Sequence, residues 1–182
     1  MLVFQKSVGL DKFWKMNRAV LLIGSNIGDL SKNLERALIL ISKESGTIGK
    51  ASLVYITEPW GRNDQPHFYN QVVELYTSLS AQVLMLKLLE IEMKMGRERT
   101  EKWTPRIIDL DILYFNNEII DEPGLKIPHP RLHERRFTME PLSELFPEMI
   151  HPCLKLTNKD LLAGLTDTLK VVALNPEPIV KS

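Results

Sequence analysis

Residues 103–115 read WTPRIIDLDILYF, and this stretch carries two carboxylates inside an otherwise apolar run. The run is rich in branched apolar residues, which predicts a β-strand over residues 107–115. Because side chains alternate between the two faces of a strand, Asp109 and Asp111 should project from the same face. The opposite face should enter a core and carries Ile108, Leu110 and Ile112. Two like charges side by side are costly to bury unless something positive lies between them, and a divalent metal would meet that need.

The simplest alternative is a pair of exposed acids on an edge strand. The flanks are strongly apolar, which favours a central strand and a metal site. Two oxygen ligands of this kind suit Mg²⁺, which keeps several waters and shares phosphate oxygens. Arginines lie nearby at Arg97, Arg99 and Arg106. The first two alone would fit a solvated loop. Beside metal ligands, however, their planar guanidinium groups indicate a phosphate-bearing substrate.

Bulk composition narrows the class of protein. The chain has 182 residues, with 23 Lys plus Arg and 23 Asp plus Glu, so its formal net charge is zero. A general nucleic-acid-binding protein usually needs a basic excess, so we expect no nucleic-acid partner. The single cysteine excludes an intrachain disulfide and favours a cytoplasmic location. No apolar run approaches the length of a membrane span, so we expect no membrane partner.

We expect one catalytic domain over residues 16–170, preceded by an extension at 1–15 and followed by a tail at 171–182. The order of strand and helix patterns is β-α-β-β-α-β, typical of a ferredoxin-like α+β sandwich. Its sheet would be antiparallel, with both helices on one face, the other face free for a site, and extra C-terminal elements. The expected strands are residues 18–24, 47–57, 68–79 and 107–115, and the expected helices lie between Asp29 and Gly46 and between Ser80 and Gly96.

A second basic stretch, IPHPRLHERRF at residues 127–137, has no clear helix or strand pattern and is expected to be a loop. Prolines on both sides of His129 restrict the backbone there, which indicates a positioned imidazole. A solvated basic loop is the alternative. Arg135 and Arg136 are adjacent, so one of them must face away from any single site.

Aromatic residues form a third group, at Trp60, Phe68, Trp103 and Phe137. Phe68 could be part of the core, but tryptophans in loops rich in Gly and Pro are less easily explained as core. A flat heteroaromatic ligand could stack between such rings. Asn70, on the same strand as Phe68, offers an amide that both donates and accepts, as the edge of a pterin or purine requires.

The motifs together resemble the 6-hydroxymethyl-7,8-dihydropterin pyrophosphokinase family of folate biosynthesis. The resemblance covers about residues 19–146. Its motifs in this chain are LLIGSNIGD, YITEPWG, DQPHFYN, GRER, WTPRIIDLDIL and IPHPRLHERRF. The family transfers pyrophosphate from ATP to the hydroxymethyl group of the dihydropterin and releases AMP. The chain departs from the family pattern at Thr104, where a small residue is common and a stiffer loop would follow.

The resemblance implies a role for each matching position. Asp109 and Asp111 would bind two Mg²⁺ ions, and Arg97 and Arg106 would stabilise phosphate charge as catalytic residues beside them. ATP would be the co-substrate, and its binding would involve Arg99, Arg106, Ile112, His129 and Arg135. The pterin pocket would consist of Thr57, Trp60, Phe68, Asn70, Trp103 and Phe137.

Two other functions fit the same residues. A metal-dependent nucleotidyltransferase also uses paired aspartates on a strand, but it would release pyrophosphate. A non-catalytic binding module with this fold would not need two aspartates and three arginines together. For the pyrophosphokinase we expect a monomer whose loops at residues 58–66 and 97–105 close over bound substrates.

Overall fold

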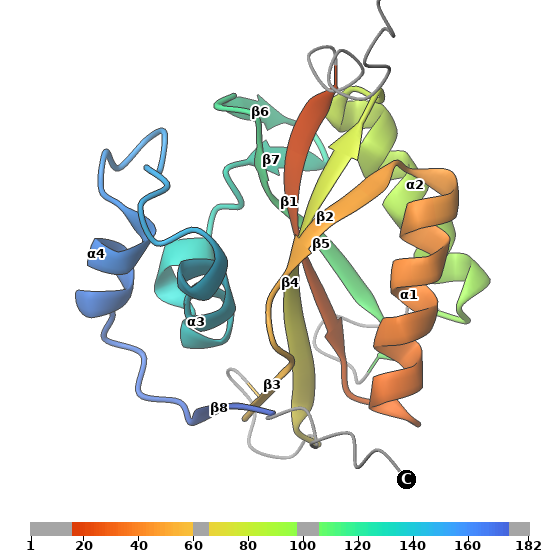
Figure 1. Cartoon of the computed structure of the whole chain (residues 1–182), viewed down its shortest axis with the longest axis horizontal. Coiled ribbons are helices and arrows are strands. Elements are labelled where there is room, and N and C mark those ends of the chain that lie inside the picture. The colour runs from red at the N-terminus through yellow and green to blue at the C-terminus, as the bar shows by residue number, and fades with distance from the viewer. Residues whose placement is uncertain (1–15, 60–65, 98–105, 175–182) are drawn as a thin grey trace, which may run out of the picture.

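The structure, a computed structural model, describes residues 16–59, 66–97 and 106–174. It is an α+β arrangement built on one antiparallel sheet in the strand order β5-β1-β4-β3-β8, with β2 also paired to β4 (Figure 1). A separate hairpin joins β6 to β7. The strands are β1 (Asn17–Ser25), β2 (Thr47–Ala51), β3 (Tyr55–Thr57), β4 (Phe68–Thr77), β5 (Asp109–Phe115), β6 (Ile120–Glu122), β7 (Leu125–Ile127) and β8 (Val171–Ala173). The helices are α1 (Leu30–Glu44), α2 (Ala81–Lys94), the 3₁₀ turn η1 (Leu132–Glu134), α3 (Arg136–Leu145) and α4 (Asn158–Ala163).

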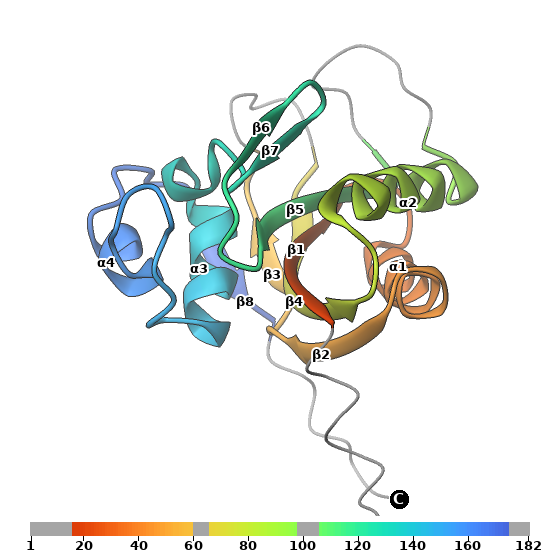
Figure 2. The same ribbon diagram turned by 90° about the horizontal axis from the view of Figure 1, so that it is seen from above.

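Two helices cover one face of the sheet, as predicted. Helices α1 and α2 lie together on this face, and Figure 2 shows both on the same side of β1, β4 and β5. Each begins at the boundary expected from the sequence with a side-chain cap: the Asp29 side chain accepts from the Lys32 N–H, and the Ser80 side chain from the Val83 N–H. Their apolar stripes pack on alternate strand residues such as Leu21 and Leu75. This is the larger of two cores.

The opposite face carries a second core beneath a helix that the sequence did not predict. Residues 127–137, expected to be a loop, instead contain the end of β7, η1 and the start of α3. Helix α3 packs on this face through Met139 and Leu142, which join Val20 and Leu22 of β1 in the second core. The face predicted to be free is therefore partly covered, and α3 and α4 lie across the sheet from α1 and α2 (Figure 1).

Strand β5 alternates as predicted but lies at the edge of the main sheet, not at its centre. Leu110 and Ile112 enter the first core, so Asp109 and Asp111 face the other side. The outer edge of β5 is covered by other groups instead of a strand. Its Leu110 N–H donates to the Glu92 carboxylate at 2.8 Å, and its Leu113 carbonyl accepts from the His129 N–H at 3.0 Å. These contacts satisfy main-chain groups at the outer edge of β5.

Two predicted boundaries are corrected. The strand expected over residues 47–57 is divided into β2, which ends at Ala51, and β3, which begins at Tyr55, and both pair with β4. The predicted tail at 171–182 begins with β8, which pairs with β3 and extends the sheet by one strand. The described residues contain no helix long and apolar enough to cross a membrane. Residues 1–15 lie outside the described part of the chain.

Candidate active site

The site begins with a row of three residues on adjacent strands. Gly24 of β1 pairs with Asn70 of β4 on one side and with Asp109 of β5 on the other. All three positions lie on the face opposite the first core. A Cβ at Gly24 would stand 2.9 Å from the Asn70 Oδ1 and 3.9 Å from the Asp109 Cβ. Because Gly24 has no side chain, the Asn70 amide and the Asp109 carboxylate can lie close to its main chain on the same face of the sheet.

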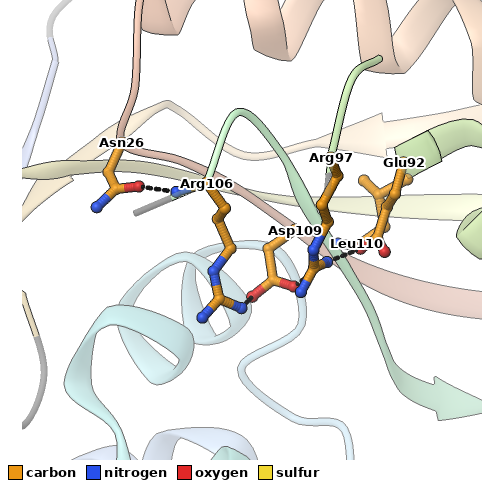
Figure 3. Close-up of polar contacts among 6 residues, drawn as sticks. All are labelled: Asn26, Glu92, Arg97, Arg106, Asp109 and Leu110. Atoms are coloured by element: carbon orange, nitrogen blue, oxygen red, sulfur yellow. Dashed lines mark hydrogen bonds and ion pairs between the residues drawn. The ribbon is translucent and has the colours of Figure 1, made fainter. Parts of the chain in front are cut away.

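Two arginines bracket the Asp109 carboxylate. Arg97 Nη1 donates to its Oδ1 at 2.6 Å, and Arg106 Nη1 donates to its Oδ2 at 2.7 Å. Figure 3 shows the two guanidinium groups approaching Asp109 from opposite sides. The three side chains are only 20–27% exposed, so these ion pairs are screened less than pairs on an open surface. The predicted association of Arg97 and Arg106 with the aspartate strand is thus present in the structure.

Asp111 lies two residues after Asp109 on β5, so its side chain is on the same face of the strand. Burial, and then the negative charge of Asp109, raise the pKa of Asp111 to about 7. Arg135 and Arg97 act in the opposite sense and favour the charged form. The Asp111 carboxyl therefore takes up a proton more readily than an ordinary aspartate does.

Two residues that the sequence reasoning missed hold this arrangement in place. Glu92 of α2 is 3% exposed and accepts from both Arg97 Nη1 and the Leu110 N–H. Burial raises the pKa of Glu92, and Arg97 partly offsets that effect. Asn26 accepts from the Arg106 N–H at 2.7 Å and donates its own N–H to the Arg106 carbonyl. The signal for Glu92 was an acid four residues after Leu88, on the edge of an apolar helix stripe.

His129 lies beside the same strand edge as a neutral imidazole. Burial, with smaller effects from Arg135 and Arg131, lowers the pKa of His129 to about 4. Its Nδ1 accepts from the Arg131 N–H at 3.3 Å. The neutral ring must then carry its proton on Nε2, which leaves Nε2–H as a donor.

The adjacent arginines Arg135 and Arg136 are distinguished by their contacts. Arg136 donates from Nη1 to Glu140 at 2.9 Å and from Nε to the Asp167 carbonyl at 2.8 Å. Arg135 interacts electrostatically with Asp111 and Asp109, and its guanidinium carbon lies 5.6 Å from the centre of the Phe137 ring. Arg135 is therefore the member of the pair that faces the carboxylates.

The residues predicted for the aromatic substrate divide into three groups. Asn70 Nδ2 donates to Thr57 Oγ1 at 2.8 Å, and both residues are buried. Phe68 lies two residues before Asn70 on β4 and so shares its face. Phe137 is the second residue of α3 and packs on the second core, beneath Arg135. Trp60, Trp103 and Arg99 lie outside the described residues, as does Thr104.

Ile112 differs from its predicted place among the ATP-binding residues. Its side chain is 4% exposed and belongs to the first core, on the face opposite Asp109 and Asp111. A contact between Ile112 and ATP would have to come from its main chain, which lies at the edge of the sheet. Among the described residues no cluster of three or more His, Cys, Asp or Glu is arranged to hold a metal. A surface hollow of about 730 Å³, lined by Arg18, Ile119 and Phe146, lies apart from these residues.

Paired carboxylates bracketed by arginines on one sheet face are typical of enzymes that act on phosphorylated substrates. The sequence model of the 7,8-dihydro-6-hydroxymethylpterin-pyrophosphokinase (HPPK) family matches residues 20–147. The chain belongs to this family.

Named relatives cover most of the chain. The 2-amino-4-hydroxy-6-hydroxymethyldihydropteridine pyrophosphokinase of Bacillus subtilis is 43% identical over 130 residues, which are 71% of this chain and 78% of that protein. The enzyme of the same name from Haemophilus influenzae is 36% identical over 162 residues, which are 88% of this chain and 100% of that protein.

Solved structures support the fold. An HPPK-DHPS chain of Plasmodium falciparum matches with a TM-score of 0.70 at 22% identity, covering 82% of this chain and 45% of that one. The wild-type form of the same protein matches with a TM-score of 0.68 at 20% identity, covering 82% and 44%. The chain thus spans less than half the length of these solved chains, and the likeness concerns the fold alone.

Proposed function

We propose that the chain transfers pyrophosphate from ATP to the hydroxymethyl group of 6-hydroxymethyl-7,8-dihydropterin and releases AMP. One observation carries this proposal: the Asn70 amide and the Asp109 carboxylate flank Gly24 on adjacent strands. A group able to bind a pterin edge thus lies beside a group suited to phosphate chemistry. The relatives named above bear the name of this activity.

We propose Mg²⁺ as the cofactor, held as two ions by Asp109 and Asp111. The donor set fits, because both carboxylates share one face of β5 and Mg²⁺ prefers oxygen ligands of this kind. Bound Mg²⁺ would neutralise charge on the phosphate oxygens on both sides of the β-phosphorus.

In this proposal, Arg97 and Arg106 exchange partners when substrate binds. Their guanidinium groups are engaged with Asp109, so a cation that takes Asp109 as a ligand competes with them. The released guanidinium groups can then donate to phosphate oxygens and stabilise charge that develops during the transfer. Glu92 keeps Arg97 at the site during this exchange, because its carboxylate is buried and fixed to β5.

His129, beside the outer edge of β5, and Arg135, which faces the carboxylates, would bind the triphosphate. The neutral imidazole donates from Nε2 without adding charge, and Arg135 supplies a permanent positive charge near Asp111. The main chain of Ile112 and the side chain of Arg99 would complete the ATP-binding residues. AMP would then leave from the part of the site that these ATP-binding residues form.

The pterin would bind on the other side of Gly24. Asn70 and Thr57 would read its polar edge, and Phe68, Trp60, Trp103 and Phe137 would contact its rings. Loops 58–66 and 97–105 would close over both substrates and exclude water, which would otherwise compete with the hydroxymethyl group for the β-phosphorus.

We further propose that the scaffold is a ferredoxin-like sandwich and that the chain acts as a cytoplasmic monomer without a nucleic-acid partner. The strand order β5-β1-β4 followed by β2 and β3 supports the first point. The single, exposed Cys153 is compatible with a reducing compartment. Light scattering after gel filtration would test the monomer.

The direct test is to incubate the chain with ATP, Mg²⁺ and the dihydropterin and to separate the nucleotide products. AMP together with a pyrophosphorylated pterin is expected. ADP would indicate an ordinary kinase. Free pyrophosphate would support the nucleotidyltransferase alternative, and tight binding of both substrates without turnover would support a binding module.

A further inference from the structure

Asp167 joins the C-terminal segment to the start of α3, at a distance of 31 residues along the chain. Its Oδ2 accepts from the Arg136 N–H at 2.8 Å, and its Oδ1 accepts from the Leu169 N–H at 3.0 Å. Its own carbonyl accepts from Arg136 Nε at 2.8 Å. Three hydrogen bonds thus fix this residue to the first residue of α3 and to the turn that leads into β8.

The first bond serves as a helix cap supplied from another part of the chain. The first N–H groups of a helix lack partners within it, and the preceding residue, Arg135, provides no side-chain cap. A carboxylate at this end is also favoured by the helix dipole. Asp167 therefore fixes where α3 begins and the direction in which the chain enters it.

Arg135 is the residue at that entry point. Its backbone is extended, at φ −122° and ψ 114°, and its guanidinium group interacts with Asp111 and Asp109. If the Arg136 N–H loses its partner, the turn between Arg135 and Arg136 is less constrained. The guanidinium group of Arg135 would then spend less time facing the carboxylate strand.

The same segment continues to the opposite side of the site. After Asp167 it forms β8, whose Val171 pairs with Thr57 of β3. The Lys170 carbonyl accepts from the Glu58 N–H, and the Lys170 N–H donates to the Glu58 side-chain carboxylate. Figure 1 shows the chain running from α4 past α3 to β8 beside β3. The segment that contains Asp167 is thus fixed to α3 through Asp167 itself and to β3 through β8. The family match ends at residue 147, so this segment lies outside it.

We propose that Asp167 is a positioning residue for ATP binding, acting through Arg135. The proposal rests on the function proposed above, since it assigns Arg135 to the triphosphate. It differs from a purely structural cap in one respect: the effect of Asp167 on nucleotide affinity should depend on the presence of the Arg135 side chain.

The test compares binding of α,β-methylene-ATP with Mg²⁺ by calorimetry in the full chain. Asp167→Ala should raise the Kd about tenfold, the change that matches loss of a strong helix cap. Asp167→Asn keeps one acceptor oxygen and should recover most of the affinity, and it also serves if the alanine variant does not fold. Asp160→Ala is the matched control, because Asp160 is an exposed carboxylate at the start of another helix, α4, where its side chain accepts from Thr157 Oγ1.

A double-mutant cycle supplies the decisive readout. In an Arg135→Ala background, Asp167→Ala should change the Kd by less than about twofold, because the group on which it acts has been removed. Equal effects of Asp167→Ala with and without Arg135, or a Kd unchanged in Asp167→Ala itself, would overturn the proposal.

The wild-type chain is assayed for AMP in parallel. Absence of AMP would count against the proposed function while the binding comparison still reads the role of Asp167. Normal AMP production together with unchanged binding by Asp167→Ala would reject only this inference.

Discussion

Gly24 and Asn70 are opposite each other in the β1–β4 pair, and a Cβ on Gly24 would stand 2.9 Å from the Asn70 Oδ1. Real Cβ atoms are essentially never this close to another heavy atom, so Gly24→Ala must displace the Asn70 amide. That movement would break the Asn70–Thr57 hydrogen bond. We expect the KM for the dihydropterin to rise about tenfold, as for loss of a well-placed buried polar contact, with a smaller change in ATP affinity.

Gly164→Ala is the control for this variant. The Cβ there would meet nothing nearer than 3.5 Å, and Gly164 has an ordinary negative φ of −86°. Steady-state kinetics of both variants with each substrate varied would separate the two sides of the site. An equal rise in both KM values for Gly24→Ala would indicate a general disruption of the sheet.

The aspartate pair gives the second prediction. Asp111→Ala should lower the rate of AMP release at least about a hundredfold at saturating Mg²⁺, the scale of losing one preorganised electrostatic group. The matched control is Asp121→Ala, an exposed carboxylate whose ion pair with Lys126 lies on the β6–β7 hairpin. Near-normal turnover by the Asp111 variant would refute its assignment as a metal ligand.

The third prediction concerns stability and Glu92. Glu92→Ala would leave the buried Leu110 N–H without its acceptor and remove a partner of Arg97. We expect a loss of about 1–3 kcal/mol in the free energy of unfolding, measured by urea denaturation. Glu92→Gln retains an acceptor oxygen and should lose less.

Glu90→Ala, two residues away on the same helix, tests the specificity of that effect. Its ion pair with Lys87 is exposed, so the loss should be much smaller than for Glu92→Ala. If the Glu90 and Glu92 variants were equally destabilised, the buried bond to β5 would not be the cause.

The local parts of this fold could be predicted from sequence. Asp109 and Asp111 share a face because strand geometry alone determines it, and α1 and α2 begin at side chains three residues from the N–H groups that they cap. The position of Arg106 beside Asp109 also follows from their short separation in sequence.

The parts that could not be predicted depend on distant partners. Helix α3 contains Pro141, and its first N–H is capped by Asp167, so neither propensity nor a local cap indicated it. Strand β8 is three residues long and gains its structure by pairing with β3. The apolar flanks of β5 predict a central strand, whereas β5 lies at the edge of the sheet. Its outer main-chain groups bond to Glu92 and His129, which are distant in sequence and could not be identified as partners from the local pattern.

The last prediction is a pH dependence of stability that belongs to His129. Its folded pKa of about 4 lies below the unfolded value of about 6.5, so the folded state favours the neutral ring. The stabilisation from this residue is complete above pH 6.5 and is lost as pH falls towards 4, because the unfolded chain then binds the proton first. The charged groups around the ring are Asp109, Arg131 and Arg135.

His129→Gln removes this titration while keeping a polar side chain. Urea denaturation at pH 7 and pH 5 should therefore show a smaller loss of stability on acidification in the variant than in the wild-type chain. Asp111 has a raised pKa and contributes with the opposite sign, but it is present in both proteins and cancels in the comparison. Parallel slopes for the two proteins would mean that His129 titrates alike in the folded and unfolded states. The neutral Nε2 donor assigned to ATP would then be wrong.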